Sequence, residues 1–175
     1  DWDGSYLGAW CLPHELYGPG YILSGDEDLR AHYIGNDLQI AHLNAAFPHG
    51  DGLICSSLIP GAIGSFSAQG EYRELLRGFV GAHGARAHSD GGFYFCDSCN
   101  GLLIECDAEA RIRRRFKLDS VWLHDAECVG PDLFICAPSD RNTFELWDVR
   151  TQQRHWTLRC EEYGATTQFI SVGPA

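Results

Sequence analysis

The sequence predicts an all-β fold made of repeated four-stranded units. Three observations support this: glycine is frequent, at 20 of 175 residues, long apolar helical stripes are missing, and the chain repeats itself every 41 residues. Frequent glycine suits tight turns between short strands, and a period of this length is typical of stacked repeat units. With 45% hydrophobic residues, the chain is also rich enough in apolar side chains to build a core.

Each clear repeat begins with a histidine, at positions 42, 83 and 124. A first strand starts there, and apolar second strands are expected to start at Gly52, Gly92 and Asp132. Third strands are expected over 63–66, 102–107 and 144–148, and more polar fourth strands over 72–76, 112–116 and 154–158. The apolar second strands suit a central position covered on both faces, and the arginine run at 113–115 suits an exposed outer strand.

Four strands in about 41 residues match one blade of a β-propeller. A single blade cannot bury both of its faces, and stacking blades face to face gives a continuous core. We predict one propeller domain over residues 1–175, with blades at about 10–41, 42–82, 83–123 and 124–164 and a closing strand at 165–172. The ring is either completed by both ends of this chain, or incomplete and completed by further blades or a second chain. The number of blades is left open.

Two segments resemble known propeller repeats. Residues 91–107 combine a glycine, an apolar strand, an Asp-Ser-x-Asn turn and a second apolar strand, which resembles the NHL-type repeat. Residues 144–151 contain Trp147-Asp148, which resembles the end of a WD40 strand, although no blade has the Gly-His pair of WD40 repeats in the right place. The resemblance implies a propeller fold, and it implies no particular activity because propellers carry many functions.

The three histidines at the repeat starts, His42, His83 and His124, are the main functional signal. The first strand of a propeller blade lines the central channel, so equivalent residues point at one axis. Imidazole nitrogen binds transition metals, and three protein ligands with an open position are typical of catalytic sites. We therefore predict a metal site, with iron or zinc as the ion. The alternative is a purely structural ring in which each histidine hydrogen-bonds a neighbouring blade.

Other polar residues on the same strands complete the predicted site. Asn44, Asp125 and Glu127 are expected to orient the histidine rings. Arg86 is expected either to face a channel ligand or, alternatively, to be exposed to solvent or to form an ion pair. The chemistry resembles that of carotenoid-cleaving dioxygenases, propellers whose axial histidines hold non-haem iron, but those use four histidines where this chain has three. That departure leaves the reaction open among a metal-dependent oxygenase, lyase and hydrolase acting on a small molecule.

Two functions without catalysis compete with the metal enzyme. One is an interaction propeller that binds a protein or a glycan at the channel mouth, and the other is a structural subunit of a larger assembly. The metal content of the purified protein distinguishes these functions from the metal enzyme, because only the metal enzyme requires about one transition metal per chain.

Composition disfavours several partners and locations. A formal net charge of −11 would repel nucleic acid, and no apolar run approaches the ~20 residues that cross a bilayer. Most of the eight cysteines lie in apolar strand-like runs and are interpreted as small buried hydrophobic residues, which favours a reducing compartment such as the cytoplasm. Cys96 and Cys99 form a lone Cys-x-x-Cys in a turn, without the second pair that a zinc site needs. His49 and His88 are expected to be exposed.

Overall fold

The computed structural model describes residues 41–163, which form three four-stranded antiparallel sheets. The first described blade contains β1 (Leu43–His49), β2 (Gly52–Ser57), β3 (Ala62–Phe66) and β4 (Tyr72–Arg77). The second contains β5 (Ala82–Ala87), β6 (Phe93–Asp97), β7 (Leu102–Cys106) and β8 (Ile112–Lys117), with a 3-10 helix, η3 (Ser98–Asn100), before β7. The third contains β9 (Leu123–Gly130), β10 (Leu133–Pro138), β11 (Thr143–Asp148) and β12 (Gln153–Arg159), followed by the 3-10 helix η4 (Cys160–Tyr163).

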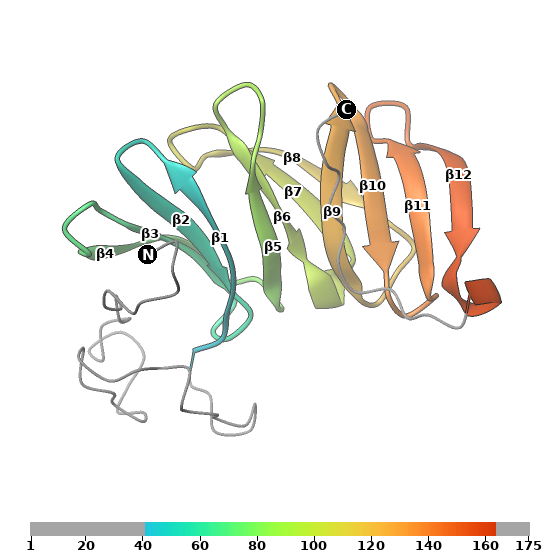
Figure 1. Cartoon of the computed structure of the whole chain (residues 1–175), viewed down its shortest axis with the longest axis horizontal. Coiled ribbons are helices and arrows are strands. Elements are labelled where there is room, and N and C mark those ends of the chain that lie inside the picture. Colours follow the sequence, from blue (N-terminus) through green and yellow to red (C-terminus); the bar gives the residue numbers. More distant parts are fainter. Residues whose placement is uncertain (1–40, 164–175) are drawn as a thin grey trace, which may run out of the picture.

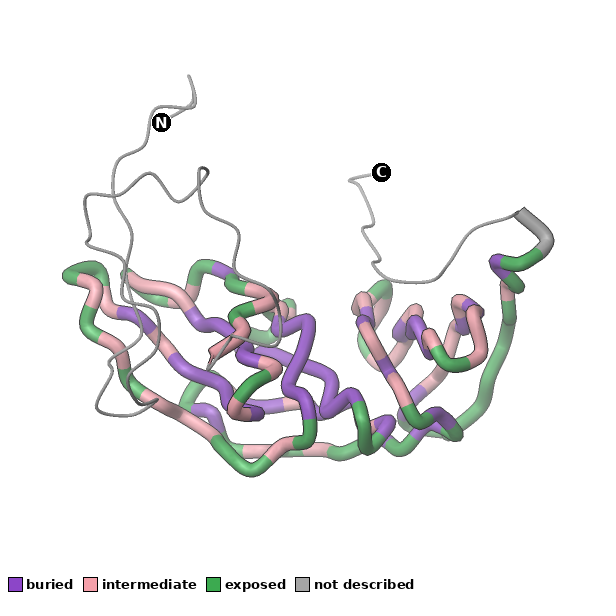
Figure 2. The backbone as a smooth tube through the Cα atoms, turned by 90° about the horizontal axis from the view of Figure 1, so that it is seen from below, coloured by how far each residue is buried: buried purple, intermediate pink, exposed green. Residues whose placement is uncertain are grey.

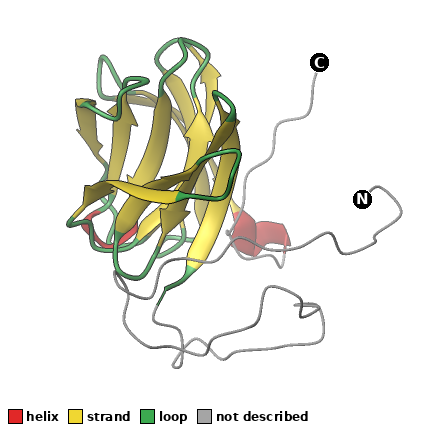
Figure 3. Ribbon diagram, turned by 90° about the vertical axis from the view of Figure 1, so that its left-hand side faces the viewer, coloured by secondary structure: helices red, strands yellow, loops and turns green. Residues whose placement is uncertain are grey.

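In each blade the strands pair in chain order, each with the next. Figure 1 shows the three blades side by side, with the first strands β1, β5 and β9 neighbouring one another along one side. Viewed from the side, the loops gather at the two ends of the strands (Figure 3). The prediction of an all-β propeller-type fold is confirmed, and the sheets of residues 41–163 do not close a ring. The predicted blade at 10–41 and closing strand at 165–172 lie outside the described residues.

Two hydrophobic clusters join the blades. The cluster between the first and second blades contains Phe47, Ile54, Ile63, Ala82, Ala85, Phe93, Phe95, Ile104, Cys106 and Ala110. The cluster between the second and third blades contains Tyr94, Cys96, Leu103, Phe116, Leu118, Leu123, Ala126, Phe134, Cys136 and Val149. Successive side chains of a strand point to opposite faces, so β6 supplies both clusters in alternation. All five residues of β6 are buried. Figure 2 shows buried segments within the blades and exposed segments at many of the turns.

The outer strand β8 has the expected opposite character. Its arginines at 113 and 115 are exposed, while Phe116 turns inward to the second cluster. Arg114 binds Glu105 on the neighbouring strand, with nitrogen–oxygen distances of 2.6 and 2.8 Å, and reaches Asp132 of the third blade at 2.7 Å. This arginine therefore connects two blades through charge as well as packing.

The described cysteines are all free, and most are small core residues, as the sequence indicated. Cys55, Cys96, Cys106, Cys136 and Cys160 are buried. In the Cys-x-x-Cys segment, Cys96 is buried in β6 while Cys99 is exposed in η3, and neither forms a disulfide. Across residues 41–163, no helix is long and apolar enough to cross a membrane.

Candidate functional site

The histidine column lies at the start of the inner strands. His83 and His124 are the second residues of β5 and β9, and their rings lie against each other with centroids 4.3 Å apart and planes tilted by 43°. His42 directly precedes β1 and lies close enough for its charge to lower the pKa of His83. The structure thus brings two of the three histidines into contact and the third within electrostatic range.

The column as it stands is not a three-donor metal centre. Within residues 41–163, no group of three or more His, Cys, Asp or Glu side chains is arranged to hold a metal ion. The His83 and His124 rings contact each other as a tilted pair, and that contact alone supplies two imidazoles, not three. The metal therefore stays a prediction from the sequence.

His83 is buried and neutral. Burial, followed by the charge of His124, lowers its pKa from 6.5 to about 4, against the opposing effect of a hydrogen bond to the backbone of His124. Nδ1 of His83 is buried and has no hydrogen-bond partner among the described residues. We infer that Nε2 carries the proton for the bond to His124, which leaves an unused lone pair on Nδ1.

Arg86 is held between two carboxylates of the next blade. Its guanidinium lies 2.6 Å from Asp125 and 2.9 Å from Glu127, and Asp125 is almost fully buried. Burial is the largest single effect and would lower the pKa of Arg86, but the charge and hydrogen bond of Asp125 together with the charge of Glu127 outweigh it, so the pKa is raised. Burial raises the pKa of Glu127, and the charge of Arg86 offsets part of that effect. Oε2 of Glu127 is buried and makes no hydrogen bond, although it is in ion-pair range of Arg86.

A bulge in β5 makes room for this ion pair. The pairing of β5 with β6 shifts between His83 and Arg86, and Gly84 has a φ of +60°. A Cβ on Gly84 would lie 2.6 Å from Oδ1 of Asp125. Glycine is therefore needed here both for the backbone conformation and for the approach of the carboxylate.

These residues line one groove, which we call the inner-strand groove. Its volume is about 370 Å³. The lining residues that concern us are Asn44, Ala46, Phe47, His83, Gly84, Arg86, Tyr94, Asp125 and Glu127. The groove therefore runs along β1, β5 and β9 and lies over the junctions between the blades.

Asn44 has a mainly structural set of contacts. Its Nδ2 donates to the carbonyl of Ala82 at 2.9 Å, and its Oδ1 accepts from Ser56 Oγ at 2.6 Å and from the N–H of Gly84 at 3.3 Å. Asn44 thus ties the first blade to the backbone on both sides of His83 in the second.

Five of the seven residues singled out in the sequence meet in the inner-strand groove. They are Asn44, His83, Arg86, Asp125 and Glu127. Asp125 and Glu127 bind Arg86, so the ion-pair interpretation of Arg86 agrees with the structure. Sequence reasoning missed Tyr94 and Phe47, because aromatic residues in apolar strands look like core. The positive φ of Gly84 could not be predicted, because the presence of a glycine does not by itself reveal its backbone conformation.

A second hollow, of about 550 Å³, lies beside β11 and β12. Its buried carboxylate, Glu145, accepts from Arg141 at 3.1 Å, Arg154 at 3.2 Å and Trp147 Nε1 at 2.8 Å. This carboxylate is already well supplied with donors, so the inner-strand groove is the better candidate for binding a ligand.

Comparisons with known proteins support the fold. No protein-family model matches the chain, and no curated protein matches it. Among solved structures, virginiamycin B lyase from Staphylococcus aureus is similar with a TM-score of 0.55 and 11% identity, over 67% of this chain and 41% of that one. A streptogramin B lyase matches with a TM-score of 0.55 and 12% identity, over 67% of this chain and 40% of that one.

A protein of unknown function from Bacteroides caccae is also similar, with a TM-score of 0.52 and 11% identity, over 69% of this chain and 47% of that one. At such identities the likeness shows a propeller-like fold and nothing of the activity. This chain spans about two fifths of the length of the two lyases.

Proposed function

We propose that this propeller binds a small molecule in the inner-strand groove, through hydrogen bonds that the ligand donates. The observation that carries the proposal is a buried acceptor in the groove, Nδ1 of His83, which has no hydrogen-bond partner among the described residues. Oε2 of Glu127, which also lines the groove, is paired with the guanidinium of Arg86 at 2.9 Å. A buried polar atom without a partner costs about 1–3 kcal/mol. A ligand that supplies N–H or O–H groups would recover this cost.

The charge and size of the groove narrow the ligand class. Two carboxylates, Asp125 and Glu127, face one guanidinium, Arg86, so the groove favours neutral or cationic donors over anions. A volume of about 370 Å³ lies at the lower end of the range for small-molecule sites. Small amines and polyols fit both requirements.

Catalysis on such a ligand would use His83. With a pKa of about 4 the neutral ring is a weak base, so it would hold a hydroxyl or amine of the ligand through a hydrogen bond and take the proton only as the bond to that proton breaks. The solved neighbours named as lyases make lyase chemistry the first activity to assay, ahead of hydrolase and oxygenase chemistry.

A transition metal on the histidine column is the second candidate. It is favoured by the contact between the His83 and His124 rings and by the effect of His42 on the pKa of His83. Iron or zinc there would supply Lewis-acid chemistry. Elemental analysis tests this: about one metal per chain, lost in His83→Ala, supports it, and metal-free protein rejects it.

Ligand binding is tested by thermal shift with a panel of small amines and polyols. Ala46 is exposed and lines the groove, so Ala46→Trp should block it without disturbing the core. Ala108→Trp, in an exposed turn away from the groove, is the matched control.

We expect compounds that stabilise the wild type and Ala108→Trp to lose their effect in Ala46→Trp and in His83→Phe. A panel without stabilising compounds, or compounds that act equally on all variants, would contradict the proposal and favour the protein or glycan interaction scaffold.

We also propose that further blades or a second chain complete the ring. On the third blade, Ile135 pairs with Leu146 and Leu146 with Trp156, so the three share one face of the sheet. Trp156 remains 47% exposed. Light scattering after size exclusion tests this. If a second copy completes the ring, this chain should be a dimer, and a stable monomer of this chain would contradict that alternative. If further blades complete the ring, a longer form of the chain should be a monomer.

A further inference from the structure

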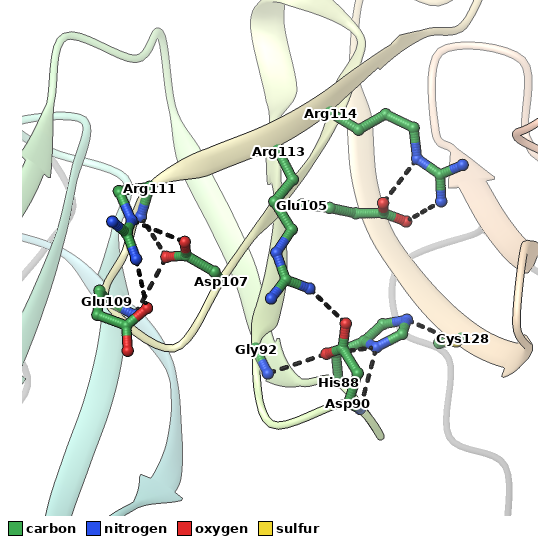
Figure 4. Close-up of polar contacts among 10 residues, drawn as sticks. All are labelled: His88, Asp90, Gly92, Glu105, Asp107, Glu109, Arg111, Arg113, Arg114 and Cys128. Carbon is green, nitrogen blue, oxygen red and sulfur yellow. Dashed lines mark hydrogen bonds and ion pairs between the residues drawn. The ribbon is translucent and has the colours of Figure 1, made fainter.

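A thiol, an imidazole and a carboxylate meet at the other end of the inner strands. Cys128, near the end of β9, places its Sγ 3.7 Å from Nε2 of His88, which directly follows β5. Nδ1 of His88 lies 2.9 Å from Oδ1 of Asp90, in the turn before β6. Figure 4 shows the three side chains in a row between the second and third blades.

Asp90 is held in place by two further contacts. Arg113 of β8 donates to Oδ2, and the N–H of Gly92 donates to Oδ1 at 2.9 Å. The backbone N–H of Asp90 also lies near Nδ1 of His88, but at the longer distance of 3.4 Å. The shorter contact with the carboxylate puts the proton on Nδ1, so Nε2 faces the thiol with a lone pair.

Packing fixes the imidazole while leaving the sulfur within reach of solvent. The His88 ring stacks on Phe134 with centroids 6.5 Å apart and meets Tyr94 edge-on at 6.1 Å. Its side chain is 14% exposed, whereas the sequence suggested an exposed residue. Tyr94 also accepts the backbone N–H of Cys128 at 3.0 Å, and Cys128 is half-buried.

The resting form of this cysteine is a protonated thiol. Burial raises the pKa of Cys128, so few molecules carry a thiolate at neutral pH. The Sγ also lies 3.1 Å from the carbonyl of Gly130, which can accept the thiol hydrogen. Attack by this sulfur therefore requires a base, and His88 is the base that the fold places beside it.

We propose that Cys128, His88 and Asp90 form a reactive-thiol site that is alkylated by α,β-unsaturated carbonyl compounds. The sulfur bonds to the β-carbon while its proton passes to Nε2 of His88, and the π electrons of the double bond move to the carbonyl as an enolate. His88 then returns the proton to the α-carbon. The addition has no leaving group and needs no oxidant. Asp90 acts as a positioning residue that stabilises the protonated imidazole.

This site adjoins the inner-strand groove at Tyr94, which lines the groove and accepts the N–H of Cys128. Cys128, His88 and Asp90 are themselves not among the residues that line the groove, and the proposal does not use His83. The chain supplies its own controls. Cys99 is more exposed than Cys128, and the sequence around it offers no comparable histidine and carboxylate pair. Cys55 and Cys96 are buried, so their protection reports that the protein is folded.

The test is alkylation with N-ethylmaleimide at pH 7, followed for each cysteine by peptide mass spectrometry. We expect Cys128 to react at least about ten-fold faster than Cys99 despite its lower exposure, since general-base catalysis is worth 10²–10⁴-fold in favourable cases. His88→Asn should remove this advantage while Cys99 keeps its rate. A Cys128 rate at or below that of Cys99 in the wild type would overturn the proposal.

A double-mutant cycle separates positioning by Asp90 from a structural role. Asp90→Asn should slow alkylation of Cys128 when His88 is present and have no further effect in His88→Asn. Equal effects in both backgrounds would contradict a relay. If Cys55 and Cys96 become reactive in His88→Asn, that variant is not properly folded. The test then uses Asp90→Asn alone, because Asp90 lies in an exposed turn where the substitution should not disturb folding. An unchanged Cys128 rate in that variant then rejects the proposal.

Discussion

Acidification should destabilise this protein through His83. The pKa of this residue is about 4 in the folded chain against 6.5 for an ordinary histidine, mainly because of burial. Between these two values the unfolded chain binds a proton at His83 that the folded chain does not. Stability contributed by the neutral ring is therefore present above pH 6.5 and is lost progressively as the pH falls towards 4.

The magnitude follows from the size of the shift. A change from 6.5 to about 4 amounts to about 3 kcal/mol when fully expressed, at about 1.4 kcal/mol for each pKa unit. Integrating the proton uptake only from pH 7 to pH 5 gives about 2 kcal/mol. This narrower window avoids most of the titration of ordinary carboxylates.

The assay is urea unfolding at pH 7 and pH 5, followed by tryptophan fluorescence, for the wild type and His83→Phe. The variant also loses the hydrogen bond to His124, but that loss is an offset present at both pH values. The wild type should lose about 2 kcal/mol more than His83→Phe on acidification. Equal losses in the two proteins would refute the assignment of His83 as a buried neutral ring.

Three further changes test the construction of the groove by urea unfolding. Gly84→Ala should cost at least about 1 kcal/mol more than Gly50→Ala, because both have a φ of +60° but only Gly84 approaches a carboxylate; equal costs would reject the clash. Arg86→Met should lower the free energy of unfolding by about 3 kcal/mol, because it leaves Asp125 buried without its cation. Adding Asp125→Asn to this variant should restore part of that loss, and additive losses would show that the two residues are not coupled. Asn44→Leu should cost about 2 kcal/mol, and a loss below about 0.5 kcal/mol would mean that its bridge between blades is not stabilising.

Much of the fold follows from local sequence pattern. The 41-residue period places the starts of β1, β5 and β9 within one residue of His42, His83 and His124. The apolar run of β6 predicts a strand covered on both faces, because only a central strand of a stacked blade buries every side chain. The closure of the ring was not predictable, because it depends on contacts between elements far apart rather than on any one repeat.

The sequence predicted several of the residues that belong to the site, but not which of them contact each other. Asp125 and Arg86 were recognised as polar residues on inner strands, but their ion pair depends on a bulge at Gly84 that shifts the register of β5. His88 and Cys128 are 40 residues apart and meet only because adjacent blades place the ends of their first strands together. Repeat spacing reveals equivalent positions, whereas such contacts join positions that are not equivalent.

The central claim is that His83 presents a neutral ring with a bare Nδ1 beside the inner-strand groove. Long-range ¹⁵N–¹H correlation spectra of the histidine rings report the protonation of each nitrogen directly. At pH 7 in metal-free protein we predict that His83 carries its proton on Nε2 alone and that this pattern persists at pH 5. A ring protonated on both nitrogens at either pH, or on Nδ1 alone, would contradict the account.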